Sequence, residues 1–189
     1  IIVPGTKNTL SDLAWLWRQG LAQHIRLCAQ HGTAVLGICG GYQMLGERVS
    51  DPLGIEVEAG TVEPGLNLLA IETIFQALDA KITVQSFPQL HASSRRGLFA
   101  HLPEQPLQTY QIHAGKTFLA GTDGTPTFQT SPVSAESPEC DGWLSTDGWC
   151  AGAYFHGLFE NTVFRQSTLE ALAARRSQIF VPSEQSVFD

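Results

Sequence analysis

Cys39 is the residue of this chain whose surroundings best suit a nucleophile. It follows the apolar run Val35-Leu36-Gly37-Ile38 and precedes Gly40-Gly41, so a buried strand ends and a helix begins at the thiol. Glycines at such a junction permit the sharp turn that lifts one side chain above a sheet. The N–H groups of the following helical turn favour a thiolate and can bind an oxyanion. A core cysteine gains nothing from these glycines, which weaken strand and helix, so the pattern favours nucleophilic chemistry.

His156 is the best candidate for the base that such a thiol requires. The apolar run from Trp149 to Phe155 predicts a buried strand that delivers His156 at its end, next to Gly157. An imidazole there can ionise the thiol and then protonate a leaving nitrogen. An isolated strand histidine is more often structural, but its pairing with Cys39 favours the catalytic role.

The elements around Cys39 predict a parallel sheet. Ile1 to Val3 is a β-branched strand stopped by Pro4-Gly5, a helix with one buried face follows from about 10 to 31, and a second strand runs over 33–38. Strand, helix and strand in this order form a βαβ unit, whose ligands bind beyond the carboxyl ends of the strands. Gly5 and Cys39 both lie at those ends, although a plain strand-to-helix turn also explains residues 4–9.

The second half of the chain predicts an antiparallel or mixed arrangement. Asp123-Gly124 reads as a hairpin turn, and residues 137–147 read as a polar connection. The remaining expected elements are strands at Lys81–Phe87, Thr109–His113, Phe118-Leu119 and Thr127-Phe128, and a helix through Val163, Phe164, Leu169 and Leu172.

Composition predicts one globular domain over residues 1–189. Hydrophobic residues make up 43% and charged residues 15% of the chain, and the net charge is −7 without a basic cluster, which argues against nucleic acid as a partner. No apolar run has the length of a membrane span, and the four cysteines show no metal or disulfide spacing, which favours a cytoplasmic protein. The chain opens inside a strand without methionine, so we expect it to be part of a longer protein.

Gly115-Lys116-Thr117 does not form a phosphate loop. That motif requires a glycine five positions before Gly115, where the chain has Tyr110. No other stretch supplies the motif, so we expect no cofactor in this chain and place any ATP chemistry outside it.

Four segments carry a family resemblance. Gly37, Cys39, Gly41 and Gln43 match G-x-C-x-G-x-Q, which resembles the active-site signature of class I glutamine amidotransferases. The segments PGTKNT (4–9), GICGGYQMLG (37–46), YQIHAG (110–115) and FHGLFE (155–160) are similar to the C-terminal amidotransferase domain of the cobyric acid synthase family. The resemblance implies an α/β, flavodoxin-like fold, with a parallel-to-mixed central sheet flanked by helices and lacking its first strands. It further implies that the cysteine attacks the carboxamide of L-glutamine, forms a glutamyl thioester and releases ammonia.

The resemblance also assigns roles to individual residues. His156 is the general base and then the acid, and the backbone N–H groups of Gly5 and Gly40 bind the oxyanion. Gln43 contacts the bound glutamine. His113 either touches the glutamine or is a strand histidine satisfied by a neighbour, and the second reading is favoured.

The histidine segment departs from most class I enzymes. They carry His-x-Glu, whose glutamate orients the imidazole, whereas position 158 is Leu158. Cobalamin-pathway members lack this third group, so the departure supports the narrower resemblance. Glu160 or a backbone carbonyl is left to orient His156.

The resemblance places the rest of the reaction elsewhere. An associated or covalently linked synthetase domain, absent from this chain, binds ATP and Mg, and the corrinoid acceptor is adenosylcobyrinic acid a,c-diamide. The alternatives are the amidotransferase of cobyrinic acid a,c-diamide synthase, a cell-wall amidotransferase subunit and an inactive interaction domain of the same fold. A cysteine-dependent α/β hydrolase is disfavoured because no acidic partner for the histidine is found.

Overall fold

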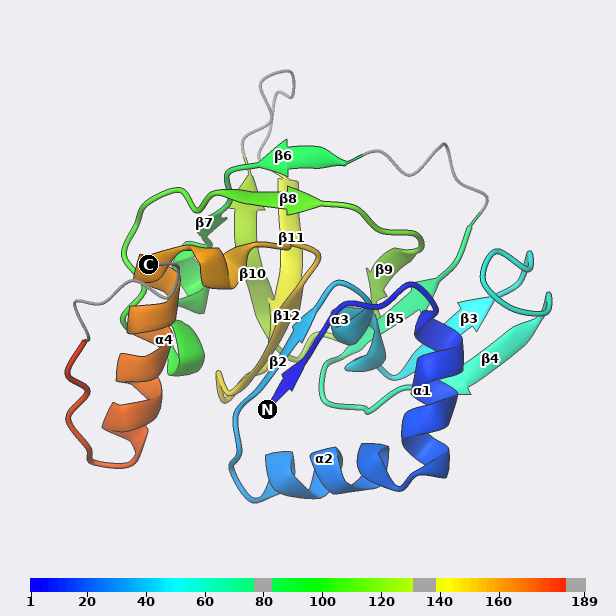
Figure 1. Cartoon of the computed structure of the whole chain (residues 1–189), viewed down its shortest axis with the longest axis horizontal. Helices are drawn as coiled ribbons and strands as arrows, with labels where there is room; N and C mark the ends of the chain where they lie inside the picture. The colour runs from blue at the N-terminus through cyan, green and yellow to red at the C-terminus, as the bar shows by residue number, and fades with distance from the viewer. Residues whose placement is uncertain (77–82, 131–138, 183–189) are drawn as a thin grey trace.

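The computed structural model describes residues 1–76, 83–130 and 139–182 (Figure 1). The strands are β1 (Ile2–Val3), β2 (Val35–Ile38), β3 (Arg48–Asp51), β4 (Thr61–Pro64), β5 (Ile71–Ile74), β6 (Val84–Ser86), β7 (Gln89–Leu90), β8 (Thr109–Gln111), β9 (Lys116–Leu119), β10 (Thr125–Thr130), β11 (Glu139–Leu144) and β12 (Cys150–Ala153). The helices are α1 (Thr9–Arg18), α2 (Leu21–Gln30), α3 (Gly40–Met44) and α4 (Thr162–Arg175), with 3-10 turns η1 (Ala92–Ser94), η2 (Gly97–Phe99) and η3 (Leu158–Glu160).

A six-stranded mixed sheet organises the molecule. Its order is β1-β2-β12-β11-β10-β7, in which β1, β2 and β12 are parallel and the pairs from β12 onward are antiparallel (Figure 1). This confirms the predicted parallel-to-mixed sheet. Because carboxyl ends of parallel strands meet at one edge, the segments that follow β1, β2 and β12 come together there. These segments carry Gly5, Cys39 and His156.

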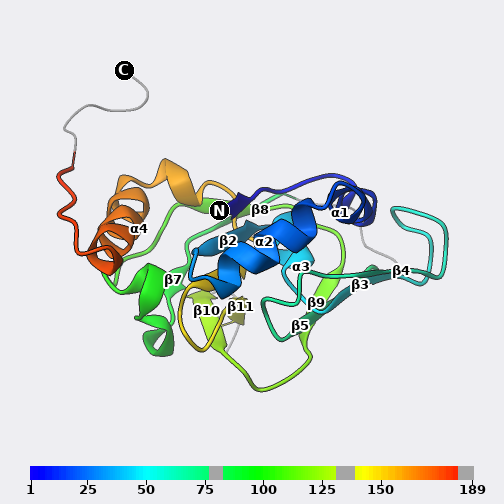
Figure 2. The same cartoon turned by 90° about the horizontal axis from the view of Figure 1, so that it is seen from below.

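The two faces of this sheet bury different side chains, as the alternation along a strand requires. Val35 packs on one face with the helices that precede and follow β2, and Leu36 packs on the other with the aromatic side chains of η2 and α4. Figures 1 and 2 place α2 beneath the amino end of β2 and α4 at the other side of the molecule. Helices therefore flank the sheet, and the site edge lies away from α2.

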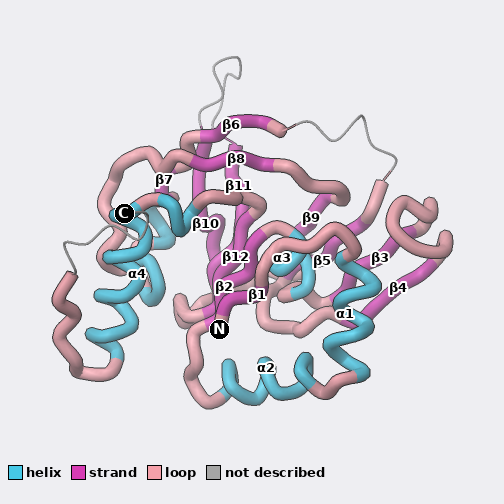
Figure 3. The backbone as a smooth tube through the Cα atoms, viewed as in Figure 1, coloured by secondary structure: helices cyan, strands magenta, loops and turns pink. Residues whose placement is uncertain are grey.

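The hairpin predicted around Asp123-Gly124 is wrong. β9 pairs with β5 in a four-stranded sheet of order β4-β3-β5-β9, whereas β10 pairs with β11 and β7 (Figure 3). Trp143 explains the difference, because its indole Nε1 donates to the carbonyl of Asp123 at 2.8 Å and its ring lies against Gly124. The turn is thus held against Trp143 of β11. The polar connection predicted over 137–147 is also wrong, because β11 occupies residues 139–144.

The single helix predicted over about 10–31 is divided in two. Gly20 adopts the left-handed conformation with φ of 72° and separates α1 from α2. α1 buries Leu10 and Leu13, and Trp17 donates its indole N–H to the carbonyl of Pro64 at 2.7 Å. The chain therefore turns after α1, which a continuous apolar periodicity does not reveal.

The other predicted elements are mostly found. The strand expected at Lys81–Phe87 appears as β6, paired with β8, although positions 81 and 82 lie outside the described residues. The helix expected around Phe164 is α4.

Candidate active site

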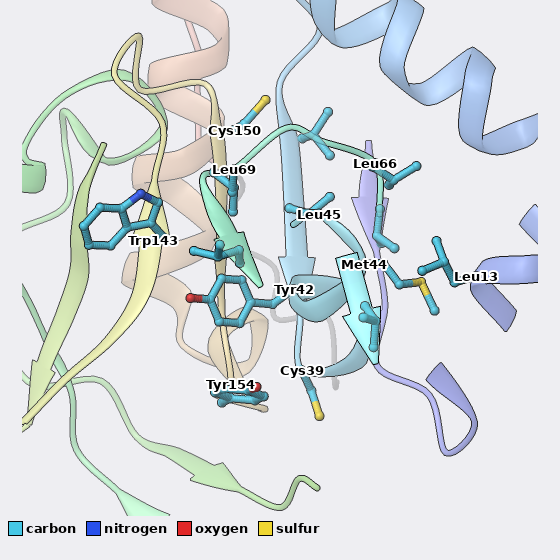
Figure 4. Close-up of a cluster of buried hydrophobic side chains, with 14 of the residues drawn as sticks. Leu13, Cys39, Tyr42, Met44, Leu45, Leu66, Leu69, Trp143, Cys150 and Tyr154 are labelled. Carbon is cyan, nitrogen blue, oxygen red and sulfur yellow. The ribbon is translucent and has the colours of Figure 1, made fainter. Parts of the chain in front are cut away.

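Cys39 occupies a strained turn between β2 and α3. Its φ of 52° and ψ of −113° lie outside the regions that side-chain-bearing residues prefer, at a cost on the order of 1–3 kcal/mol. The turn is held by backbone hydrogen bonds from Cys39 to the carbonyl of Ala153 at 2.9 Å and from Gln43 to the carbonyl of Cys39 at 3.1 Å. Figure 4 shows the sulfur at the end of β2, pointing away from the side chains packed around Tyr42. The predicted sharp turn is therefore present.

The glycines around Cys39 are required by close backbone approach. A Cβ at Gly41 would lie 1.9 Å from the carbonyl oxygen of Val3, and one at Gly37 would lie 2.7 Å from the backbone of Tyr42. Both contacts are far shorter than carbon atoms allow. Glycine at 41 lets the end of β1 approach the turn that holds Cys39, and glycine at 37 lets the start of α3 pack against β2.

Gly5 joins the residues predicted to form the site. A Cβ built on Gly5 would lie 3.1 Å from Cε1 of His156 and 3.4 Å from Cβ of Cys39. Gly40 contacts the same loop, since a Cβ there would lie 2.9 Å from Cγ2 of Thr6. The structure thus brings Cys39, His156 and the two predicted oxyanion glycines to one place, although 117 positions separate the cysteine from the histidine.

His156 is held by its backbone and by one aromatic ring. Its N–H donates to the carbonyl of Tyr110 at 2.8 Å, and the N–H of Tyr110 donates back at 3.2 Å. The two rings stack with centroids 5.0 Å apart and an interplanar angle of 12°. Burial lowers the pKa of His156, so the imidazole is neutral at neutral pH. Its buried Nε2 has no hydrogen-bond partner within residues 1–76, 83–130 and 139–182, which leaves that atom available to a proton.

Leu158 and Glu160 are the side chains considered in place of the missing acid. Leu158 is 1% exposed and packs in the core beneath α4. The carboxylate of Glu160 lies beside Gly157, and across the described residues no hydrogen bond connects it to His156. The orienting role considered for Glu160 stays a prediction.

Gln43 is buried in a hydrogen-bond network that holds the site together. Its Oε1 accepts from the Thr9 hydroxyl at 3.0 Å, and its Nε2 donates to the carbonyl of Ala114 at 2.7 Å and to the Tyr154 hydroxyl at 3.2 Å. The side chain therefore links the start of α1, the segment before β9 and the residue that follows β12. A contact between Gln43 and bound glutamine stays a prediction. The hydrogen bonds show that this side chain also holds three segments around the site together.

His113 lies in the segment that passes over Cys39. Its ring stacks on Tyr154 with centroids 3.7 Å apart, and its Nδ1 lies 3.3 Å from the carbonyl oxygen of Gly115. Burial, and repulsion from His156 when that imidazole is protonated, lower the pKa of His113. The thiol of Cys39 lies 3.6 Å from the carbonyl oxygen of Ile112. The ring of His113 is thus stacked and lies within hydrogen-bond distance of a carbonyl, as expected for a histidine satisfied by its neighbours. Its predicted contact with bound glutamine stays a prediction.

Sequence reasoning missed the aromatic members of the site. Tyr154 supports His113 by stacking and Gln43 by hydrogen bonding, and Tyr110 covers one face of His156. Tyr110 opens the YQIHAG segment (110–115), and Tyr154 directly precedes the FHGLFE segment (155–160). Their apolar strand context was the available signal, but it does not tell which ring a tyrosine will meet.

Gly115-Lys116-Thr117 lies at the start of a strand. β9 begins at Lys116, so a strand follows the glycine instead of the helix whose N-terminal amides cradle a phosphate. Among the described residues no group of three or more His, Cys, Asp and Glu side chains is placed to hold a metal ion.

Two cavities are lined by residues that contact or neighbour His156 and His113. One of about 480 Å³ is lined by Tyr110, Gly157 and Glu160, and another of about 480 Å³ is lined by His113, Tyr154 and other residues. A larger, mainly apolar cavity of about 670 Å³ lies between α4 and the start of β1. Neither Cys39 nor His156 lines it. None of these three cavities is lined by Cys39 or His156, so the site is identified by the convergence of those two residues and not by a cavity. In the part of the chain that the structure covers, no helix could cross a membrane.

The comparison with protein families decides the classification. The model of the CobB/CobQ-like glutamine amidotransferase domain matches residues 1–164. The chain belongs to this family. The resemblance predicted from the four segments is thereby confirmed.

Relatives of this family member include two named cobyric acid synthases. The protein of Photorhabdus laumondii is 40% identical over 178 residues, covering 93% of this chain and 33% of the relative. That of Roseiflexus castenholzii is 40% identical over 183 residues, covering 97% and 35%. The chain thus spans about a third of the length of these relatives.

A solved structure supports the fold. It is titled a crystal structure of glutamine amidotransferase, with a TM-score of 0.62 at 17% identity over 90% of this chain and 77% of the other. At this identity the likeness establishes the fold of the family member and does not extend to its substrates.

Proposed function

We propose that this chain hydrolyses L-glutamine through a covalent intermediate on Cys39. The observation that carries the proposal is the meeting of Cys39 and His156 at Gly5. His156 removes the thiol proton, and the thiolate forms a bond to the carboxamide carbon of glutamine. The carbon–nitrogen bond breaks, the imidazolium returns its proton to the nitrogen, and ammonia leaves. Water then attacks the thioester with His156 as base, which releases glutamate and restores the thiol.

The surroundings of the two residues support these steps. A neutral imidazole is required to accept the first proton, and burial keeps the pKa of His156 low. The oxyanion that forms on the carboxamide needs N–H donors, and Gly5 and Gly40 lie at the turn where that oxygen would stand. Gln43 fixes the loops that carry these groups, and we propose that it also contacts the bound glutamine.

We further propose that the chain is the amidotransferase domain of a cobyric acid synthase. Relatives with that printed name match it at 40% identity over most of its length. In this proposal a linked synthetase domain, which binds ATP and Mg, uses the released ammonia to amidate a corrinoid carboxylate. Cys28, Cys140 and Cys150 are free thiols, which favours a reducing compartment such as the cytoplasm.

Two measurements on the 189-residue chain test the glutaminase proposal. Ammonia release from glutamine is expected from the chain, and Cys39→Ala or His156→Ala should reduce it by at least about a thousandfold, the scale at which a nucleophile or its base contributes. Cys150→Ala is the matched control, since this buried thiol lies in β12 outside the site. A chain that neither releases ammonia nor reacts at Cys39 with an electrophilic glutamine analogue would favour an inactive interaction domain.

The synthetase proposal needs the full-length protein that contains this chain. With ATP and a corrinoid acid, the Cys39→Ala variant should amidate with ammonium salts and fail with glutamine. Loss with both nitrogen sources in a folded variant, or retention with glutamine, would contradict the division of labour. A cobyrinic acid acceptor used in place of its a,c-diamide would favour the diamide synthase instead.

A further inference from the structure

His156 lacks the partner that normally fixes a catalytic imidazole. The side chain two positions later, where most class I enzymes carry the orienting glutamate, is the core residue Leu158. The buried Nε2 makes no hydrogen bond to the described residues, so that atom can receive the proton but does not fix the ring. An imidazole that must receive a proton from one defined sulfur needs a fixed ring plane, because small displacements cost large factors in rate. Another contact must therefore hold the ring.

Tyr110 makes that contact in two ways. Its backbone forms a two-bond antiparallel bridge with His156, with N···O distances of 2.8 and 3.2 Å. Its side chain then lies nearly parallel to the imidazole, at 5.0 Å and 12°. The bridge fixes where the histidine stands in the sheet, and the stacked ring restricts rotation of the imidazole about its side-chain bonds.

The exposure of Tyr110 separates this contact from core packing. The residue is 39% exposed and belongs to neither core cluster. Its strand β8 pairs with β6 at the surface of the molecule, above the site edge (Figure 3). Because the ring of Tyr110 packs on one histidine and not in the core, we expect it to contribute little to the stability of the fold.

We propose that Tyr110 is the positioning residue of His156 and replaces the absent acid by stacking. The ring also shields one face of the imidazole from water, which contributes to the burial that keeps His156 neutral. This inference rests on the proposed glutaminase function. It assigns the role to the ring of Tyr110 and not to its hydroxyl.

Four variants of the chain test the proposal. Tyr110→Val and Tyr110→Leu remove the ring and keep an apolar residue in β8, whereas Tyr110→Phe and Tyr110→Trp keep a flat ring. Phe118→Val is the matched control, because Phe118 is an aromatic strand residue of β9 with 38% exposure. Glutaminase kcat, KM, the pH dependence of kcat/KM and the Tm are measured for each.

Loss of the ring should reduce kcat about tenfold with little change in KM, the scale of one aromatic pair. The acidic limb of the pH profile should move to higher pH, because a more hydrated imidazole regains its ordinary pKa. The phenylalanine variant should retain most of kcat, and the control should behave as wild type.

Three outcomes would overturn the inference. Tyr110→Leu or Tyr110→Val could keep the wild-type kcat and pH profile while Cys39→Ala is inactive, which would leave the proposed function standing alone. Tyr110→Phe could lose as much as the leucine variant, which would make the hydroxyl the important group. Equal losses in the Phe118 control would indicate a general effect on stability. An inactive wild type would instead refute the glutaminase function.

Discussion

Gly5→Ala is the substitution that most directly perturbs the meeting of the catalytic residues. The new methyl would lie 3.1 Å from Cε1 of His156, 3.4 Å from Cβ of Cys39 and 3.5 Å from the carbonyl oxygen of Ile38. The first distance is shorter than ordinary carbon contacts, so the imidazole must move by a few tenths of an ångström. The backbone N–H of residue 5 is kept, so the change isolates position from hydrogen bonding.

The magnitude follows from how steeply catalysis depends on alignment. A displacement of about 1 Å costs roughly a hundredfold, so a shift of part of that distance should reduce kcat/KM by about tenfold to a hundredfold. Stability should change by less than about 1 kcal/mol, because alanine lowers the entropy of the unfolded chain and the contact is only slightly close. Urea unfolding and ammonia release from glutamine are measured on the same preparation.

Gly121→Ala is the matched control for this experiment. Its Cβ would meet only Cβ of Ala70, at an ordinary 3.6 Å, so activity and stability should stay near wild type. A folded Gly5→Ala variant that keeps kcat/KM within about twofold of wild type would refute the reasoning. It would mean that His156 does not act from the position beside Cys39.

Further substitutions test the scaffold. Gln43→Leu leaves the Ala114 carbonyl and the Thr9 hydroxyl without their partner, and urea unfolding should show a loss of about 2–5 kcal/mol; a smaller loss would mean that the network contributes little. Gly41→Ala places a Cβ 1.9 Å from the carbonyl oxygen of Val3, so circular dichroism should show little folded protein, and a native spectrum would contradict the close approach. Burial raises the pKa of Asp141 from its ordinary 3.8 to about 6, so the folded chain binds its proton more tightly than the unfolded chain. The stability from this group is present below about pH 4 and is lost as pH rises through about 6, by about 3 kcal/mol, and Asp141→Asn should abolish that dependence in unfolding measured at several pH values. Parallel pH profiles of the two proteins would contradict it.

The local elements of the site could be predicted from sequence. The glycines at 37 and 41 predict a sharp strand-to-helix turn at Cys39, because glycine is needed there only where the backbone turns sharply. The strained φ of Cys39 agrees with that prediction. His156 could be placed at the end of a strand by the apolar run before it. Parallel pairing of β1, β2 and β12 then places these ends together.

What could not be predicted depends on tertiary contacts. Asp123-Gly124 has the composition of a hairpin turn, but Trp143 of β11 hydrogen-bonds to it and the flanking strands pair elsewhere. No local sequence pattern gives the order of strands in a sheet. Gly20 ends a helix within a periodicity that continues across it. Tyr110 gains its meaning only from the histidine that stacks on it, 46 positions away.

The central claim is that the sulfur of Cys39 forms a bond to the substrate beside His156. Incubation of the chain with an electrophilic glutamine analogue, followed by peptide mass spectrometry, tests it directly, with Cys28, Cys140 and Cys150 as internal controls. The account predicts one adduct, on Cys39, prevented by excess glutamine and greatly slowed in His156→Ala. An adduct on another cysteine, or labelling of Cys39 that is unaffected by glutamine and by loss of the imidazole, would contradict it.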